Sequence, residues 1–141
     1  MKKKKPVKEE KKLITTGKRK RAVARACFTK GKGAVKINKI PLEKVGNEMA
    51  RMKMQEPLTI AGDCWKSFSI SVTVKGGGQM GQADAARQAI SRGLVELFPE
   101  TKEMFLKYDR FLLAYDPRRT ETHKPPHSSW GARRMKQKSK R

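Results

Sequence analysis

The sequence has few of the features that mark secreted, membrane-spanning or metal-binding proteins. No stretch approaches the roughly 20 consecutive apolar residues that a membrane-spanning helix needs. Cys27 and Cys64 are the only cysteines, and two isolated cysteines form neither a disulfide framework nor a zinc knuckle. The opening MKKKKPVKEEKKLI has no apolar run behind its positive charges, so we do not expect a secretory signal. We therefore expect a cytosolic protein with reduced thiols.

Acidic residues are also scarce. The 141 residues include 35 Lys and Arg but only 13 Asp and Glu, which gives a formal net charge of +22 at pH 7. A charge this large destabilises the compact state by self-repulsion unless a polyanion neutralises it. Nucleic acid is the first candidate for that polyanion, and an anionic membrane surface is the second.

The positive charge is concentrated at the two ends of the chain. Residues 1–12 carry +5, residues 13–33 carry +7 and residues 117–141 carry +8, whereas residues 34–116 carry only +2. Lys-rich segments without apolar periodicity are typical of disorder. The sequence therefore predicts three parts: a disordered extension at 1–16, a globular domain at 17–117 and an extended basic tail at 118–141.

Hydrophobic periodicity within the central part predicts both strands and helices. The clearest strand is Ser67 to Val74, in which apolar and hydroxyl side chains alternate without exception. We predict two further strands around the loop Lys30–Gly33, paired as a hairpin, and a last buried strand in a short apolar run. These strands are Ala22–Thr29, Ala34–Ile37 and Phe111–Tyr115.

Three segments have helical spacing. Pro41 to about Met54 places Leu42, Val45, Met49 and Met52 on one face, and Pro57 is expected to restart the chain. Gln82 to Leu97 has a buried stripe of Ala83, Ala86, Ile90, Leu94 and Leu97, with Asp84, Arg87, Ser91 and Arg92 outside it. A third helix is expected from Thr101 to Tyr108. This order of elements predicts a mixed-sheet α/β or α+β domain.

The segment Gly76–Gly81 matches the G-x-G-x-x-G pattern of dinucleotide-binding folds. That fold requires a parallel sheet and an acidic residue about 20 positions further on, at the end of a second strand. Here the acidic residues at that distance, Glu100 and Glu103, fall at the start of a helix, so we reject a nucleotide cofactor. Successive glycine N–H groups before a helix still make a site for an RNA phosphate, although a tight turn explains them equally well.

No catalytic or metal site is predicted. The two histidines, His123 and His127, lie in the tail with Pro125 and Pro126 between them, so they are not held on one face of a helix. No Ser/His/Asp or Cys/His set and no paired carboxylates in a cleft are indicated. The sequence therefore predicts a protein that is not an enzyme and has no cofactor.

Three ordered motifs resemble one family of ribosomal proteins. Gly17–Arg25 (GKRKRAVAR) with Gly31–Gly33 resembles the opening of the ninth protein of the small ribosomal subunit, the S-nine family. Val74–Gly78 (VKGGG) resembles its central signature. Asp116–Arg119 (DPRR) and Lys138–Arg141 (KSKR) resemble its C-terminal signature. The resemblance covers about residues 15–141. The segments Arg119–Glu121 and Met52–Ile60 look more archaeal or eukaryotic than bacterial.

The resemblance implies a fold and a place of action. The fold is a mixed four-stranded sheet backed by helices, with a left-handed βαβ crossover. The place is the ribosome in the cytoplasm, in the head of the small subunit, with small-subunit rRNA, neighbouring head proteins and peptidyl-site tRNA as partners and no membrane. The family's tRNA contacts carry over to Lys140 and Arg141, with Lys138 nearby.

Charge and the glycine N–H groups lead to a set of expected rRNA contacts. These are Lys18, Arg19, Lys20, Arg21, Lys30, Lys32, Gly76, Gly77, Gly78, Arg118, Arg119, Arg133, Arg134 and Lys136. A free-standing basic nucleic-acid-binding protein remains the alternative, because it explains the charge equally well. It does not explain a small domain with a long tail that ends in Lys-Arg.

Overall fold

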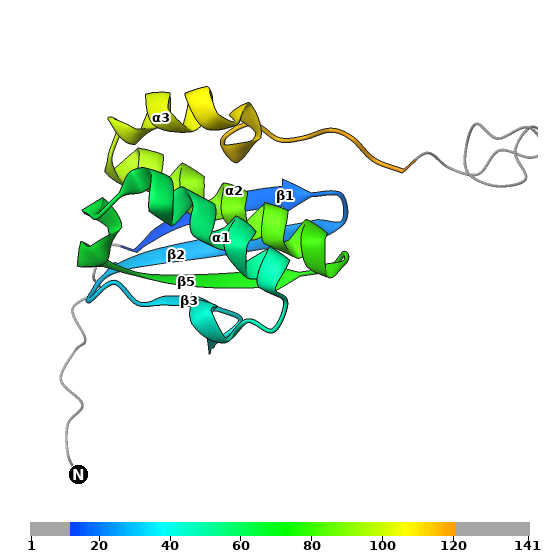
Figure 1. Cartoon of the computed structure of the whole chain (residues 1–141), viewed down its shortest axis with the longest axis horizontal. Coiled ribbons are helices and arrows are strands. Elements are labelled where there is room, and N and C mark those ends of the chain that lie inside the picture. Colours follow the sequence, from blue (N-terminus) through cyan, green and yellow to red (C-terminus); the bar gives the residue numbers. More distant parts are fainter. Residues whose placement is uncertain (1–11, 121–141) are drawn as a thin grey trace, which may run out of the picture.

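A computed structural model describes residues 12–120, in which helices cover one face of a mixed sheet (Figure 1). The strands lie in the order β1-β2-β5-β3-β4. Their bounds are β1 Leu13–Arg19, β2 Ala22–Lys30, β3 Val35–Ile37, β4 Ile40–Pro41 and β5 Phe68–Lys75. The α-helices within the described residues are α1 Glu48–Ala61, α2 Gln79–Leu97 and α3 Thr101–Tyr108. The mixed α+β class predicted from the sequence is confirmed.

Small side chains let α2 pack closely on the sheet. Ala22, Ala24 and Ala26 of β2 are buried on the face that the helices cover, and α2 contributes buried alanines of its own at Ala83, Ala85, Ala86 and Ala89. Larger side chains, including Phe28, Ile70, Ile90 and Leu94, fill the rest of the core. Burial of this apolar surface is the main stabilising contribution to such a domain.

β3 and β5 pair in parallel, with Ile37 opposite Val72. The chain passes from β3 to β5 through α1. In Figure 1 both strands run from left to right, α1 returns in front of the sheet, and β5 lies above β3. This arrangement is a left-handed crossover, whereas most βαβ units are right-handed. The hand implied by the family resemblance is therefore present, and the two-residue β4 adds a fifth strand to the expected four.

The predicted hairpin between residues 22–29 and 34–37 is wrong. β2 pairs with β1 on one side and with β5 on the other, both antiparallel. The hairpin is β1–β2, and Lys20 at its turn has φ +53°. Since β1 begins at Leu13, residues 13–16 belong to the sheet and not to the disordered extension expected at 1–16.

Helix boundaries also differ from the expectation around Pro41–Met54. A short 3-10 helix covers Leu42–Lys44, and α1 begins after Asn47, whose side chain accepts a hydrogen bond from the Ala50 N–H. This cap shifts the buried face of α1 to Ala50, Met54, Leu58 and Ala61, while Met49 and Met52 are 61% and 53% exposed. Pro57 lies inside α1 and does not restart the chain.

The other helical predictions agree better with the structure. α2 buries Ala83, Ala86, Ile90 and Leu94 as predicted, with Leu97 half-buried, but it also buries Ser91, whose hydroxyl donates to the Arg87 carbonyl. α3 has the predicted bounds. The strand expected at 111–115 is instead a 3-10 helix at Arg110–Leu112, because the Asp109 side chain caps it through the Phe111 N–H.

Candidate nucleic-acid interface

The β1–β2 turn and the glycine segment before α2 lie side by side at one end of the sheet. A Cβ added to Gly76 would stand 2.6 Å from the Arg21 carbonyl oxygen, and one added to Gly77 would stand 3.0 Å from the Ala22 nitrogen. Both glycines also have positive φ, +77° and +69°. Glycine is therefore required here for backbone conformation and for close approach. The predicted contacts at the turn and at the glycines form one surface.

The N-terminus of α2 opens onto this surface. Gly78 precedes the helix and has no side chain to cap it, and Gln79 and Met80 are exposed. The first N–H groups of a helix have no partner within the helix, and the helix dipole favours an anion there. Lys20 and Arg21, both exposed, stand next to these groups. This combination can hold a phosphate.

Two further lysines at this end were not among the predicted contacts. Lys75 ends β5 directly before Gly76. Lys39 lies in the β3–β4 turn, which the Asn38 side chain fixes to the Val74 backbone by accepting from its N–H at 2.8 Å and donating to its carbonyl at 3.2 Å. Both lysines are exposed. Lys75 could have been found from the sequence because it adjoins the glycines, whereas Lys39 depends on the topology.

Arg19 has a structural role that differs from the predicted one. Its guanidinium lies 2.6 Å from an Asp116 carboxylate oxygen and 3.8 Å from Asp84, and its side chain is 17% exposed. Arg19 and Asp116 also form a parallel β-bridge. Lys18, in contrast, is exposed, although its backbone N–H donates to Gln88. Arg19 therefore fastens β1 to the segment that leads into the C-terminal tail and has little capacity left for RNA.

Asp116 also holds the first arginine of the tail. The Arg118 side chain donates to both carboxylate oxygens, at 2.7 and 3.0 Å. These bonds, with the Arg118 backbone N–H and the charge of Arg19, lower the pKa of Asp116 from 3.8 to about 2, although partial burial opposes the shift. Arg118 remains 70% exposed, and Arg119 donates to the Tyr115 hydroxyl at 3.0 Å. Figure 1 shows the chain leaving here, at the end where β1 and β2 turn.

A second ion-pair cluster binds the helices to one another. Arg87 of α2 pairs with Glu56 of α1 at 2.9 Å and with Asp109 at 2.7 Å. Lys53 of α1 pairs with Asp84 of α2 at 2.8 Å. The net charge of residues 34–116 gave no sign of these pairs, because the partners are far apart in the sequence. Their role is to neutralise cations on the helix-covered side.

Lys30 and Lys32 lie at the opposite end of the sheet from the turn. Their loop is held by a hydrogen bond from the Gly31 N–H to the Ser67 carbonyl at 3.0 Å. Both lysines are exposed. In Figure 1 this loop is at the left, where the described chain begins, whereas the β1–β2 turn is at the right. The predicted rRNA contacts thus divide between two ends, and no single patch contains them all.

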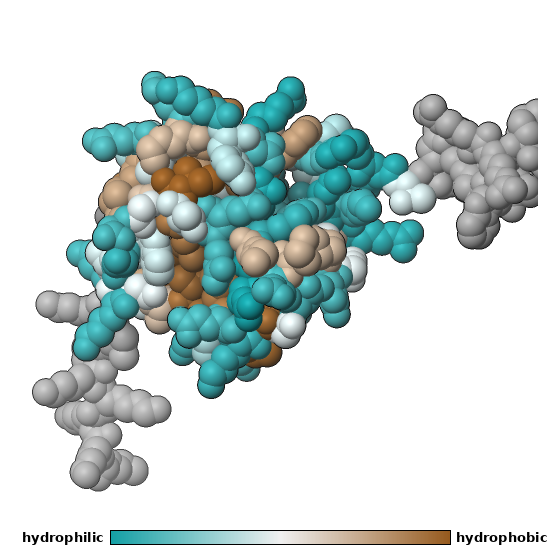
Figure 2. Space-filling model, viewed as in Figure 1, coloured by the Kyte–Doolittle hydropathy of each residue, from teal (hydrophilic) through white to brown (hydrophobic). Residues whose placement is uncertain are grey.

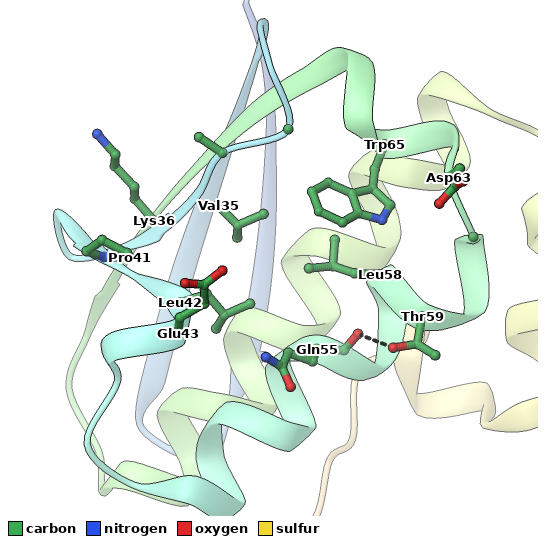
Figure 3. A pocket seen from close by; sticks show the side chains of 13 residues that line it. Val35, Lys36, Pro41, Leu42, Glu43, Gln55, Leu58, Thr59, Asp63 and Trp65 are labelled. Atoms are coloured by element: carbon green, nitrogen blue, oxygen red, sulfur yellow. Dashed lines mark hydrogen bonds between the residues drawn. The ribbon is translucent and has the colours of Figure 1, made fainter.

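A hollow of about 600 Å³ lies between the β3–β4 segment and α1. Figure 3 shows Val35, Leu42, Leu58 and Trp65 around it, and hydrophobic atoms are visible between hydrophilic ones on this face in Figure 2. Two carboxylates, Glu43 and Asp63, line it, and Asp63 already pairs with Lys66. No histidine or cysteine lines this hollow.

Within residues 12–120 no cluster of three or more His, Cys, Asp and Glu side chains could hold a metal ion. In the same range, no helix has the length and apolar character to cross a membrane. Several predicted contacts lie outside the described residues. They are Arg133, Arg134, Lys136, Lys138, Lys140 and Arg141.

A helix-backed sheet with a basic turn, a glycine-lined helix N-terminus and exposed arginines at one end is typical of basic nucleic-acid-binding proteins. Comparison with known families is more specific. Residues 17–141 match the family described as ribosomal protein S9/S16. The chain belongs to this family, whose members are structural proteins and not enzymes.

Individual relatives agree with this assignment. Small ribosomal subunit protein uS9 of Methanococcus vannielii is 50% identical over 129 residues, which cover 90% of this chain and 96% of that protein. The protein of the same name from Aeropyrum pernix is 49% identical over 147 residues, with 92% and 96% covered. That of Methanococcus maripaludis is 46% identical over 129 residues, with 90% and 96% covered. These relatives are archaeal, which agrees with the archaeal or eukaryotic form that the sequence indicated.

Proposed function

We propose that the protein is a structural constituent of the small ribosomal subunit that binds rRNA in the head of the subunit. We further propose that its C-terminal tail reaches peptidyl-site tRNA during translation, beside neighbouring head proteins on cytoplasmic ribosomes. Support for the ribosomal role comes from the names of the relatives and from family membership. Support for RNA binding comes from the arrangement of charge.

One observation carries the proposal. The exposed turn at Lys20 and Arg21, the N-terminus of α2 after Gly78, and the exit of the chain at Arg118 all lie at the same end of the sheet. RNA held at that end would lie where the tail begins. A basic tail that starts at an RNA-bound surface can follow the RNA inward, because each of its cations replaces counterions on successive phosphates.

Substitution of the turn tests the rRNA contact. Lys20→Gln with Arg21→Gln removes two exposed cations, and Lys102→Gln with Lys107→Gln removes two exposed cations from α3 as a matched control. Binding to an rRNA fragment from the subunit head is measured at several salt concentrations. We expect the turn variant to bind more weakly and its slope of log K against log salt to become shallower by about 1.8, or about 0.9 per phosphate contact. Equal behaviour of the two variants would contradict the contact.

Removal of charge from the end of the tail tests the tRNA contact. Lys138→Gln, Lys140→Gln and Arg141→Gln together keep the length of the tail, whereas deletion of residues 138–141 shortens it. Dissociation of peptidyl-site tRNA is measured on subunits reconstituted with each protein. We expect faster dissociation with both variants and unimpaired assembly, since codon pairing and rRNA also hold the tRNA. If off-rates match the wild type at physiological salt, the tail only anchors to rRNA.

Sedimentation distinguishes a ribosomal constituent from the alternative, a free-standing nucleic-acid-binding protein. A ribosomal constituent remains with the small subunit after a wash at moderate salt, because contacts on two ends and along a tail dissociate together only rarely. A free-standing protein appears in the supernatant, and that result would contradict the ribosomal proposal.

A further inference from the structure

The face of the sheet opposite the helices is uncovered in the described part of the chain (Figure 1). Alternation along each strand sends one set of side chains to this open face. The register then aligns them in rows across the strands. One row is Lys18, Val23 and Lys75, and the next is Thr16, Arg25 and Thr73. Lys36 of β3 extends a third row, opposite Ser71.

The open face carries positive charge without any compensating acid. None of the five strands contains Asp or Glu. Lys18, Arg25, Lys36 and Lys75 are all exposed, and none forms an ion pair with another described residue. On the helix-covered side, Arg19, Lys53 and Arg87 are each paired with acids. An acid-free basic face is complementary to a polyanion.

The remaining side chains on this face indicate which form of nucleic acid it fits. Single-stranded binders stack bases on aromatic side chains, but the aromatic residues of these strands are otherwise engaged. Phe28 is buried in the core, and Phe68 packs edge-on against Phe98 at 5.9 Å. Beside the exposed Ile14 and Val23, the face presents hydroxyl groups, of which Thr16 and Thr73 flank Arg25. Hydroxyls and cations suit phosphates and ribose 2′-hydroxyls, not base faces.

We propose that this open face docks on the sugar–phosphate backbone of duplex RNA, with its cations on phosphates and its threonines on 2′-hydroxyls. Strands about 4.8 Å apart place Lys18 and Lys75 roughly 10 Å from each other, with Arg25 roughly 7 Å along the middle strand from Val23. The shallow minor groove of an RNA duplex displays 2′-hydroxyls between phosphates on both sides. This inference rests on the proposed function, because it adds a second surface and a kind of RNA to the same rRNA partner.

The first test removes charge from the open face, away from the turn. Arg25→Gln with Lys36→Gln is compared with Lys20→Gln/Arg21→Gln and with the α3 control Lys102→Gln/Lys107→Gln. Binding to a blunt 20-base-pair RNA duplex and to a single strand of equal length is measured over a range of salt, after thermal unfolding confirms that each variant is folded. We expect the open-face variant to lose duplex affinity and its salt slope to become shallower by about 1.8, with the duplex bound more tightly than the single strand.

The second test removes the hydroxyls but keeps the shape. Thr16→Val with Thr73→Val retains β-branched side chains suited to strands. We expect this variant to lose preference for an RNA duplex over a DNA duplex of the same sequence, because only RNA has the 2′-hydroxyl. Equal loss for both duplexes, or none, would overturn the role of the threonines.

The outcomes separate this inference from the proposed function. If the open-face variant binds duplex RNA like the α3 control while the turn variant binds weakly, the open-face inference is overturned and the proposed function stands. If both variants match the control, both are overturned. If the open-face variant binds RNA normally but fails to associate with other head proteins during reconstitution, the face binds protein and the inference is likewise overturned.

Discussion

Replacement of Gly17 by alanine adds a single carbon atom, yet it should destabilise the domain strongly. Gly17 lies in the middle of β1, where the strand crosses α2. A Cβ at this position would stand 2.1 Å from the Ala85 carbonyl oxygen and 2.6 Å from the Ala89 nitrogen. Real Cβ contacts are essentially never under 3.0 Å. Since both obstacles belong to the helix backbone, no side-chain rotation relieves the overlap, and β1 must move away from α2.

The magnitude follows from three contributions. Overpacking of a rigid contact costs about 1–3 kcal/mol. Movement of β1 also strains two hydrogen bonds to α2, Thr15 Oγ1 to the Ala89 carbonyl at 2.7 Å and the Lys18 N–H to Gln88 at 2.8 Å, each contributing about 1 kcal/mol. Alanine recovers about 0.4–1 kcal/mol by restricting the unfolded chain. We expect a net loss of about 2–4.5 kcal/mol, which a domain with about 5–15 kcal/mol of stability survives.

Urea unfolding followed by circular dichroism measures this loss. With a slope of about 1–3 kcal/mol per M, the urea midpoint should fall by roughly 1–4 M. Gly46→Ala is the control, because an added Cβ there meets nothing within 4 Å, and it should be neutral or slightly stabilising. If the two variants shift the midpoint equally, the close contact between β1 and α2 does not exist as described.

The remaining predictions concern the chain exit and the β3–β4 turn. Because the pKa of Asp116 is lowered to about 2, its contribution to stability is complete above pH 3.8 and is lost as the pH falls toward 2. Asp116→Asn should remove this pH dependence of the unfolding midpoint, and an unchanged dependence would contradict the Arg118 contact. Asn38→Ala removes both bonds to Val74 and places alanine at φ +47°. It should lower the free energy of unfolding, measured in urea, by about 1–3 kcal/mol. A change within experimental error would show that the two hydrogen bonds from Asn38 to Val74 are dispensable.

Elements with long, regular alternation could be predicted from the sequence. Residues 67–74 alternate over eight positions, and the structure has β5 at Phe68–Lys75 with Ile70, Val72 and Val74 buried. The apolar residues of α2, from Ala83 to Leu97, recur with equally regular helical spacing. In such segments burial of one face determines the structure almost alone, because a shift of register would expose the apolar set.

Pairing between strands could not be predicted from local patterns. β3 has three residues and pairs with β5, far along the chain, so its partner depends on the left-handed crossover and not on the nearby Lys30–Gly33 loop. The run Phe111–Tyr115 is apolar but too short to distinguish a strand from a buried turn. The residues Ile14, Thr15 and Thr16 favour a strand by their β-branched side chains, a signal that the Lys-rich surroundings obscured.

The role of Arg19 shows how one boundary changes the interpretation of a site. If the strand begins at Ala22, the basic run before it is a loop in which all four cations point to solvent. Once β1 is known to start at Leu13, alternation places Arg19 on the side of buried Thr15 and Gly17, facing the helices, and Lys18 on the open face. The pairing of Arg19 with Asp116 then follows. The paired environment of Arg19 thus follows from the strand boundary and not from its chemistry.

The acidic residues account for the separation of charge in space. Residues 34–116 carry a net charge of only +2, and that sum alone would indicate a nearly neutral surface. The structure places Glu56, Asp84, Asp109 and Asp116 beside the helices, where each neutralises an arginine or lysine. The cations on the open face of the sheet, Lys18, Arg25, Lys36 and Lys75, form no such pair within the described residues. A nearly balanced segment therefore contributes Lys36 and Lys75 to a strongly positive face, because none of its acids lies on a strand and four of them hold the helices and the chain exit in place.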